Sequence, residues 1–315
     1  MPVHEVLTDS IPQESTWYPM AACPASGPVI YLMNHSSLKV ISSSKTEFRA
    51  QSDPVIACFG EVMWDCMPRG LFLGGAPNNG ACPLRRHGVH ALPLTAVGRD
   101  FLGDEILRRL KAAGLATDYI VRHGDHPTGT VQATLDPAGV PTFNIRRGVA
   151  WDHINVTSII REITPPAVLV YGTLALREKS NRRALDSLLK AWPQTLRVVD
   201  INLRPPFDTP AAIRLALAHA QLLKLNEDEL ARLAGQRRRT LHGLELSARD
   251  IARKYAVSRV CVTAGGRGAG LWWDGDWHWE KAKPVKIRDT VGAGDAFLAG
   301  FLAALLLRQQ SPHAA

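Results

Sequence analysis

From residue 55 to residue 307, short apolar runs alternate with segments of helical periodicity, an order that few folds can accommodate. The runs expected to form strands cover residues 55–59, 92–97, 168–171, 197–201, 222–225 and 260–263. The segments expected to form helices cover residues 79–87, 101–113, 180–191, 210–220, 227–234, 248–255 and 296–307. Alternation of this kind predicts an α/β protein with a largely parallel sheet covered by helices on both faces.

Two parts of the chain depart from this alternation. Residues 131–135 and 142–145 flank the turn-forming run Asp136-Pro137-Ala138-Gly139, which predicts a β-hairpin. We expect the hairpin to lie over the carboxyl edge of the sheet, where folds of this kind bind ligands. Residues 1–54 are rich in Ser, Pro and Thr and show no sustained period. We therefore expect an irregular or disordered N-terminal extension ahead of a single domain, residues 55–315.

The composition is that of a globular enzyme, because 46% of the 315 residues are hydrophobic and 21% are charged. The net charge of +8 is spread along the chain, and its densest run, residues 237–239, is expected in a surface loop rather than a nucleic-acid interface. The five cysteines show no CxxC spacing, which favours reduced thiols. No apolar run reaches the roughly 18 residues of a membrane span, and no secretory signal is recognisable. We predict a cytoplasmic protein without nucleic-acid or membrane partners.

The chemistry is concentrated near the C-terminus, in Asp289-Thr290-Val291-Gly292-Ala293-Gly294-Asp295, which precedes the apolar helix. Glycines at a helix start let backbone N–H groups approach an anion closely. A carboxylate beside them could deprotonate an attacking hydroxyl, so the run is suited to phosphoryl transfer. An aspartate N-cap on a buried helix would explain the same residues.

A second glycine pair lies in Gly74-Gly75-Ala76-Pro77-Asn78-Asn79, before the helix of residues 79–87. Bare backbone at the glycines admits a polar ligand, and Asn79 offers a donor and an acceptor to sugar hydroxyls. Asp65 follows the first strand and could accept further hydroxyl hydrogen bonds. Ordinary turns and surface polar residues remain the alternative for each of them.

Two further motifs follow strands in the C-terminal half. Asn226 and Glu229 begin a helix after the run Leu223-Lys224-Leu225 and could organise hydrated Mg²⁺ and phosphates, or could simply cap the helix. Residues 263–270 form a glycine-rich turn, but Leu271 stands where a dinucleotide fingerprint needs its third glycine. The phosphate-binding sequence of P-loop proteins is absent from the chain.

Taken together, these motifs resemble those of the ribokinase-like (PfkB) carbohydrate kinases. The resemblance covers residues 55–307 and rests on two signatures in the family order. The first runs from Gly74-Gly75 through Asn79 to Gly98, and the second covers residues 289–301. Within the family, Phe59-Gly60-Glu61 and Asp65 are most similar to the corresponding residues of fructokinases.

The resemblance implies a three-layer α/β/α fold with a small β lid, built from about residues 62–73 and 126–150. It also implies transfer of the ATP γ-phosphoryl group to a sugar hydroxymethyl group. In the catalytic part, Asp295 would be the base, and the anion hole would consist of Gly292, Ala293 and Gly294. The residues implied to contact the sugar are Asp65, Gly74, Gly75 and Asn79.

The resemblance also assigns the nucleotide side of the site. The residues implied to bind ATP are Asn226, Thr263, Gly265 and Gly268, with Arg204 near the phosphates. Glu229 would contact Mg²⁺ through water, and Asp289 would bind a monovalent cation such as K⁺. Lid strands in this family often pair across dimers, so a homodimer is compatible with the resemblance.

Two departures from the family pattern bear on function. The chain ends at Ala315, shortly after the last helix, whereas family members usually continue, so we expect a nucleotide site that is open on one side. The helix that supports Asn79 contains Gly80 and Pro83, and such residues in a helix interior cost about 1 and 3 kcal/mol. His87 takes a place that is usually apolar.

The sequence therefore predicts an ATP- and Mg²⁺-dependent sugar kinase, with fructose as the preferred acceptor. The alternatives are a catalytically impaired or truncated protein that still binds sugar or nucleotide, and a 2-keto-3-deoxygluconate or nucleoside kinase of the same family.

Overall fold

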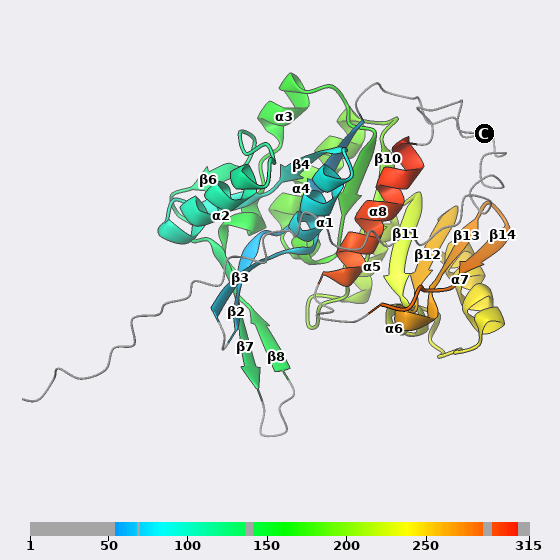
Figure 1. The fold of residues 1–315 in the computed structure, drawn as a ribbon. Helices are drawn as coiled ribbons and strands as arrows, with labels where there is room; N and C mark the ends of the chain where they lie inside the picture. The colour runs from blue at the N-terminus through cyan, green and yellow to red at the C-terminus, as the bar shows by residue number, and fades with distance from the viewer. Residues whose placement is uncertain (1–53, 68–69, 136–140, 286–291, 308–315) are drawn as a thin grey trace, which may run out of the picture.

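A computed structural model of the chain describes residues 54–67, 70–135, 141–285 and 292–307. Its main sheet contains β1 (Val55–Phe59), β4 (His90–Leu94), β9 (Val168–Tyr171), β10 (Leu196–Asp200), β11 (Leu222–Asn226), β12 (Arg259–Thr263), β13 (Ala269–Trp273) and β14 (Asp276–Glu280). These eight strands are arranged in the order β14-β13-β12-β11-β10-β9-β1-β4 (Figure 1). The six strands from β4 to β12 run parallel, and β13 and β14 add an antiparallel edge. The predicted, largely parallel sheet is confirmed.

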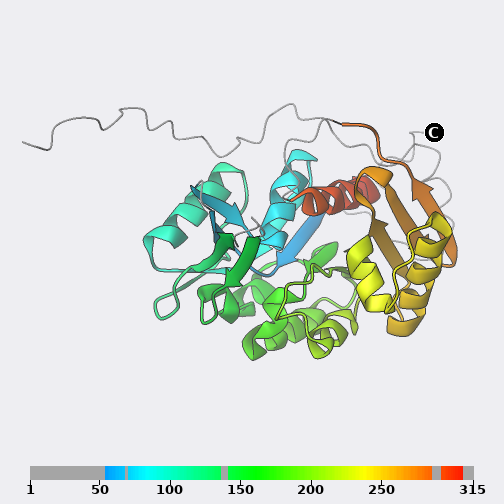
Figure 2. The ribbon, with the colours of Figure 1, turned by 90° about the horizontal axis from the view of Figure 1, so that it is seen from below.

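Helices cover both faces of this sheet, so the molecule has three layers (Figure 2). One face carries α3 (Thr157–Glu162), α4 (Lys179–Ala191), α5 (Pro210–Leu217), α6 (Glu227–Ala234) and α7 (Leu241–Tyr255). The other face carries α1 (Ala76–Arg86), α2 (Phe101–Ala112) and α8 (Ala293–Leu307). None of the helices in the described ranges is long and apolar enough to cross a membrane.

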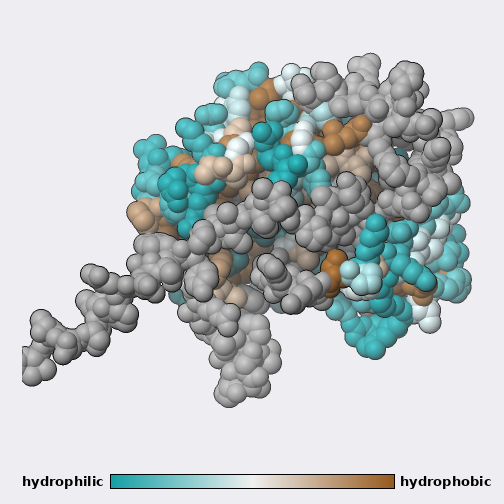
Figure 3. Space-filling model, viewed as in Figure 1, coloured by the Kyte–Doolittle hydropathy of each residue, from teal (hydrophilic) through white to brown (hydrophobic). Residues whose placement is uncertain are grey.

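The burial of the strands explains this arrangement. Alternate residues of β1 enter the two cores, with Phe59 packed on the α4 side and Ile56 on the α1 side. A strand that is buried on both faces has a continuous apolar sequence, and such runs allowed these strands to be predicted. Hydrophilic residues dominate the flanks of the molecule over α2 and α7 (Figure 3).

A second, smaller sheet contains β2 (Met63–Met67), β3 (Gly70–Gly74), β7 (Gly129–Leu135) and β8 (Pro141–Ile145), in the order β3-β2-β7-β8. Strands β7 and β8 pair antiparallel, as the hairpin prediction required, and reach beyond the main sheet in Figure 1. The predicted turn, residues 136–139, lies outside the described residues. Strand β2 joins the hairpin to the rest of the molecule by pairing parallel with β7.

Several predicted boundaries were wrong. The run 92–97 is divided at Thr95, because β4 ends at Leu94 and β5 (Ala96–Gly98) pairs instead with β6 (Val121–His123). Strand β4 is an edge strand, where Pro93 is tolerated. The helix predicted at 248–255 begins earlier, at Leu241, because the Thr240 hydroxyl caps the Gly243 N–H.

Within the described residues, three short 3₁₀ helices and the edge hairpin β13–β14 were not predicted from the sequence. The 3₁₀ helices are η2 (Ala150–His153), η3 (Leu174–Arg177) and η4 (Gly265–Arg267). The predicted N-terminal extension falls almost wholly outside the described residues, which begin at Pro54.

Candidate active site

The first turn of α8 is built around two glycines. Gly292 adopts a left-handed conformation with φ of 72°, and its carbonyl accepts the Ala296 N–H at 2.9 Å. A Cβ on Gly294 would lie 2.9 Å from Lys224 Nζ, so this position must stay bare for the ammonium to approach. A helix leaves the N–H groups of its first turn without intrahelical partners, and the nearby cation adds positive charge. This turn is therefore suited to an anion.

Lys224 is held beneath this turn by Asp200. Its Nζ donates to both carboxylate oxygens of Asp200 at 3.0 Å, and the two side chains are 8% and 7% exposed. Burial raises the pKa of Asp200 to about 6, although Lys224 opposes the shift. Burial alone would lower the pKa of Lys224, but Asp200 raises it overall. Sequence reasoning assigned neither residue, although a lysine inside an apolar run was a signal, since buried lysines are rarely unpaired.

Asp295 lies in the first turn of α8 and faces Asn79 on α1. Asn79 Nδ2 donates to Asp295 Oδ2 at 3.0 Å, which joins two residues that are far apart in the sequence. Burial raises the pKa of Asp295, and the Asn79 hydrogen bond, Lys224 and Arg204 act in the opposite direction. Because Asp295 is the third residue of the helix and bonds to α1, its position differs from that of an N-cap. The structure thus brings the two predicted site residues together.

The carboxyl group of Asp295 borders a cavity instead of being enclosed by the core. The cavity lies between the carboxyl ends of β1, β9 and β10 and the helices α1 and α8. Its polar lining comes from Glu61, Thr173, Asp200, Asn202 and Asp295, and its apolar lining includes Cys58, Leu84, Val170, Leu298 and Leu302.

Glu61 is a further carboxyl group in this cavity, and like Asp200 it was given no role from the sequence. Its Oε1 accepts the N–H of Ala76, the first residue of α1, at 3.2 Å. Burial raises its pKa to about 7, with a further contribution from Asp295, while Arg204 opposes the shift. A charged residue directly after the first buried strand was the signal that could have identified it.

The predicted sugar-binding residues lie around the start of α1. Gly75 has φ of 106°, and a Cβ there would lie 2.2 Å from the Glu61 carbonyl oxygen. A Cβ on Gly74 would lie 2.3 Å from Asp65 Oδ2, so the Asp65 carboxylate rests on bare backbone. Burial raises the pKa of Asp65, and Arg204 opposes the shift. Arg204 is exposed, and its positive charge opposes the rise in the pKa of Glu61, Asp65 and Asp295 alike.

Asn226 and Glu229 form a capping box at the start of α6. Asn226 Oδ1 accepts the N–H groups of Asp228 and Glu229 at 3.0 and 2.9 Å. The Glu229 oxygens accept the N–H groups of Leu203 and Asn226 at 2.9 and 2.8 Å. Helix capping, the alternative left open by the sequence, accounts for three of these four contacts, and the fourth ties Glu229 to Leu203. The Mg²⁺ role stays a prediction. No group of three or more His, Cys, Asp or Glu residues within the described ranges is arranged to hold a metal ion.

The predicted nucleotide loop follows β12. Thr263 is the last residue of that strand and pairs in register with Asn226 on β11, so both lie at the same edge of the sheet. Gly265 and Gly268 have φ of 54° and 128°, and a Cβ on Gly268 would lie 2.0 Å from the Glu280 carbonyl oxygen. The glycines are thus required by the turn and by the approach of β14, and nucleotide binding stays a prediction. Asp289, predicted to bind a monovalent cation, lies outside the described residues.

Comparisons with known proteins found both similar sequences and similar folds. The sequence profile of the pfkB family carbohydrate kinases matches residues 37–315, a range that begins inside the predicted extension. The chain is 28% identical over 260 residues to a fructokinase of Salmonella typhimurium, covering 78% of this chain and 82% of the relative. It is 27% identical over 243 residues to a 2-dehydro-3-deoxygluconokinase of Thermoproteus tenax, covering 72% and 71%. The structure of a Vibrio cholerae fructokinase with fructose, ADP and calcium ion bound matches with a TM-score of 0.67 at 22% identity, covering 82% and 85% of the two chains.

Proposed function

Because the chain belongs to the pfkB family of carbohydrate kinases, we propose that it transfers the γ-phosphoryl group of ATP to a hydroxymethyl group of D-fructose. The observation that carries this proposal is the hydrogen bond between Asn79 and Asp295 beside the glycine turn of α8. This bond holds the Asp295 carboxylate, in the first turn of α8 and at the border of a cavity, against Asn79, and the N–H groups of a helix start are suited to an anion. The fructokinase of Salmonella typhimurium supports fructose as the acceptor.

In the proposed reaction, Asp295 accepts the proton of the sugar hydroxyl group as the hydroxyl oxygen attacks the γ-phosphorus. The bond from that phosphorus to the bridging oxygen of ADP breaks, and ADP leaves with the bonding electrons. The backbone N–H groups of Gly292, Ala293 and Gly294 hold the negative charge of the migrating group. Lys224 supports them from below, because its ammonium lies beside Gly294.

The base strength of Asp295 follows from opposing influences. Burial raises its pKa, which makes the carboxylate a stronger base than an exposed aspartate. Asn79, Lys224 and Arg204 keep the rise in check, which favours the deprotonated form that the reaction needs.

We propose that the sugar lies against Asp65, Gly74, Gly75 and Asn79, under a lid formed by the small sheet. ATP would extend from α8 toward the ends of β11 and β12, past Asn226, Thr263, Gly265 and Gly268. Bound Mg²⁺ supplies charge neutralisation on the phosphates. Glu229 fits a contact to it through water, because its oxygens keep acceptor sites beyond their two backbone hydrogen bonds. Asp289 remains the proposed monovalent-cation residue.

The second candidate acceptor is 2-keto-3-deoxygluconate. The 2-dehydro-3-deoxygluconokinase of Thermoproteus tenax supports it, since its identity to this chain is close to that of the fructokinase. The exposed Arg204 would suit the carboxylate of such a sugar acid.

A coupled assay of ADP release over fructose, 2-keto-3-deoxygluconate and a nucleoside would test the proposal. We expect the highest kcat/KM with fructose. A preference for the sugar acid would replace fructose by the second candidate. Melting-temperature shifts with sugar and ATP, but no ADP release with any acceptor, would identify an impaired binding protein instead.

A further inference from the structure

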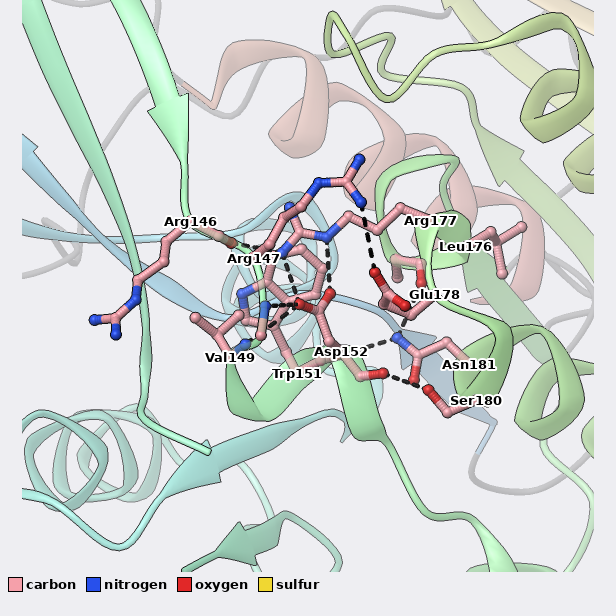
Figure 4. A network of polar contacts seen from close by, with 12 residues as sticks. Arg146, Arg147, Val149, Trp151, Asp152, Leu176, Arg177, Glu178, Ser180 and Asn181 are labelled. Carbon is pink, nitrogen blue, oxygen red and sulfur yellow. Dashed lines mark hydrogen bonds and ion pairs between the residues drawn. The ribbon is translucent and has the colours of Figure 1, made fainter. Parts of the chain in front are cut away.

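A buried ion pair joins the small sheet to the main body of the molecule (Figure 4). Arg177 donates from Nε to Asp152 Oδ1 and from Nη2 to Asp152 Oδ2, both at 2.8 Å. The two side chains are 2% and 0% exposed. Asp152 Oδ2 also accepts the N–H groups of Gly148 and Val149 at 3.0 and 3.3 Å. The carboxylate therefore fixes the turn that leads from β8 back to the main sheet.

The Arg177 guanidinium also contacts the end of the hairpin directly and its beginning through Trp151. Its Nη2 donates to the carbonyl of Arg146, which directly follows β8, at 2.6 Å. Its Cζ lies 4.0 Å from the centre of the Trp151 ring. Trp151 in turn packs against Gly129, the first residue of β7, where a Cβ would lie 2.3 Å from Trp151 Nε1. One side chain thus secures the beginning of β7 and the end of β8.

The same guanidinium reaches the segment that carries Arg204. Its Cζ lies 4.7 Å from the centre of the Phe207 ring, and the Phe207 N–H donates to the Arg204 carbonyl at 2.8 Å. Phe207 belongs to a buried apolar cluster that also contains Met63, Val131, Ile145, Val149, Trp151 and Leu174. Met63 lies on β2, two residues before Asp65. These contacts therefore reach both β2, which carries Asp65, and the segment that carries Arg204.

Stability does not account for the pair. A buried ion pair loses hydration, and its replacement by apolar residues is often neutral or stabilising. In addition, Arg177 Nη1 is buried and has no hydrogen-bond partner among the described residues. The hydrogen bonds of the pair instead fix the orientation of residues 146–149 relative to the 3₁₀ helix that carries Arg177.

We propose that Arg177 is a positioning residue that holds Asp65 on the small sheet and the Arg204 segment at the separation that the sugar requires. This inference rests on the proposed kinase function. Arg177 cannot touch the sugar itself, because its side chain is almost fully enclosed.

The test is the double variant Arg177→Met, Asp152→Asn, which removes both charges together and so leaves no unpaired buried ion. We expect its KM for fructose to rise about tenfold, the equivalent of about 1.4 kcal/mol, while the KM for ATP changes little. The matched control is Arg182→Met. Arg182 donates to the carbonyls of Leu176 and Arg177 at 2.6 and 3.1 Å, so it fastens the same 3₁₀ helix without contacting Asp152.

Amide hydrogen exchange gives a readout that needs no activity. In the double variant we expect faster exchange in residues 146–153 and 203–208 together, with α7 unchanged. If the wild-type protein phosphorylates no sugar, the proposed function fails and the exchange rates still decide whether Arg177 couples the two segments. Wild-type exchange in both segments, a wild-type KM, or an equal rise in KM in the Arg182 control would overturn the inference.

Discussion

Helices α1 and α8 meet at the hydrogen bond between Asn79 and Asp295, but the contacts that hold them in place differ. Helix α8 is apolar almost throughout and is positioned by burial on the sheet. Helix α1 buries Ala81 and Leu84 in the same core but contains Gly80 and Pro83, and its start contacts Glu61 through Gly75 and the Ala76 N–H. Both helices are thus held by burial on the sheet, but the end of α1 that presents Asn79 depends in addition on contacts with Glu61.

The largest effect is expected on the α8 side, from Asp295→Asn. The amide can still accept the hydrogen bond from Asn79, but it cannot take a proton, so kcat should fall by about 10²–10⁴-fold. The ADP-release assay at saturating fructose and ATP measures the change. Asp276→Asn, on the exposed surface of β14, is the control and should keep full activity. A loss of less than about tenfold would show that α8 delivers something other than the base.

The contact between Glu61 and the start of α1 should make stability depend on pH. Burial raises the pKa of Glu61 from 4.5 to about 7, so the folded protein binds this proton more tightly than the unfolded chain does. The stabilisation is complete below about pH 4.5 and is lost as the pH rises through about 7. Glu61→Gln keeps an acceptor for the Ala76 N–H and has no charge to bury. At pH 8 its free energy of unfolding should exceed that of the wild type by about 3 kcal/mol.

Urea unfolding of both proteins between pH 4 and pH 8 would measure this difference. Asp200, whose pKa is also raised by burial, is present in both and cancels from the comparison. Unfolding free energies that run parallel over the whole range would contradict the assigned shift.

On the α1 side, we expect the substitution Asn79→Ala to change the pKa of the proposed base, Asp295. Loss of the hydrogen bond removes one influence that lowers the pKa of Asp295, so the pKa should rise. The acidic limb of the pH profile of kcat/KM should then move to higher pH, because more of the base is protonated at low pH. A hydrogen bond to a charged group corresponds to roughly a tenfold additional loss on this limb, beyond the pH-independent loss of the proposed Asn79 contact to the sugar. An equal loss at every pH would instead assign Asn79 to the sugar alone.

The sequence was sufficient for features that depend on local pattern. Continuous apolar runs correctly predicted the parallel strands. The glycine pair before an apolar run correctly indicated the first turn of α8. The sequence did not identify the roles of Lys224, Asp200 and Glu61. These roles depend on which strands are neighbours in the sheet and on which helices pack against the ends of those strands. Asn226 and Glu229 show a different limit, since the same residue types serve a helix cap and a phosphate site.

The start of α1 was also misjudged, because its cause is not local. The predicted helix began at Asn79, whereas the observed one begins at Ala76. Gly75 sets that start through its contact with Glu61, and a Cβ added to Gly60 would lie 2.6 Å from Pro77 Cγ. Such contacts between backbone segments leave no periodic trace in the sequence.

The smallest predicted effect concerns Gly80, which lies within α1, and it is compared with Gly75, which precedes the helix. Gly80 lies within the helix, borders the cavity, and has nothing within 4 Å of an added Cβ. Gly80→Ala should therefore stabilise the protein by about 1 kcal/mol, the difference in helix propensity, without loss of activity. Gly75→Ala should destabilise it, because φ is 106° and the new methyl group would meet the Glu61 carbonyl oxygen at 2.2 Å. Thermal unfolding of the two variants should shift in opposite directions. A destabilised Gly80→Ala variant would mean that α1 needs the flexibility of this glycine to present Asn79, and that its weakness is part of the site.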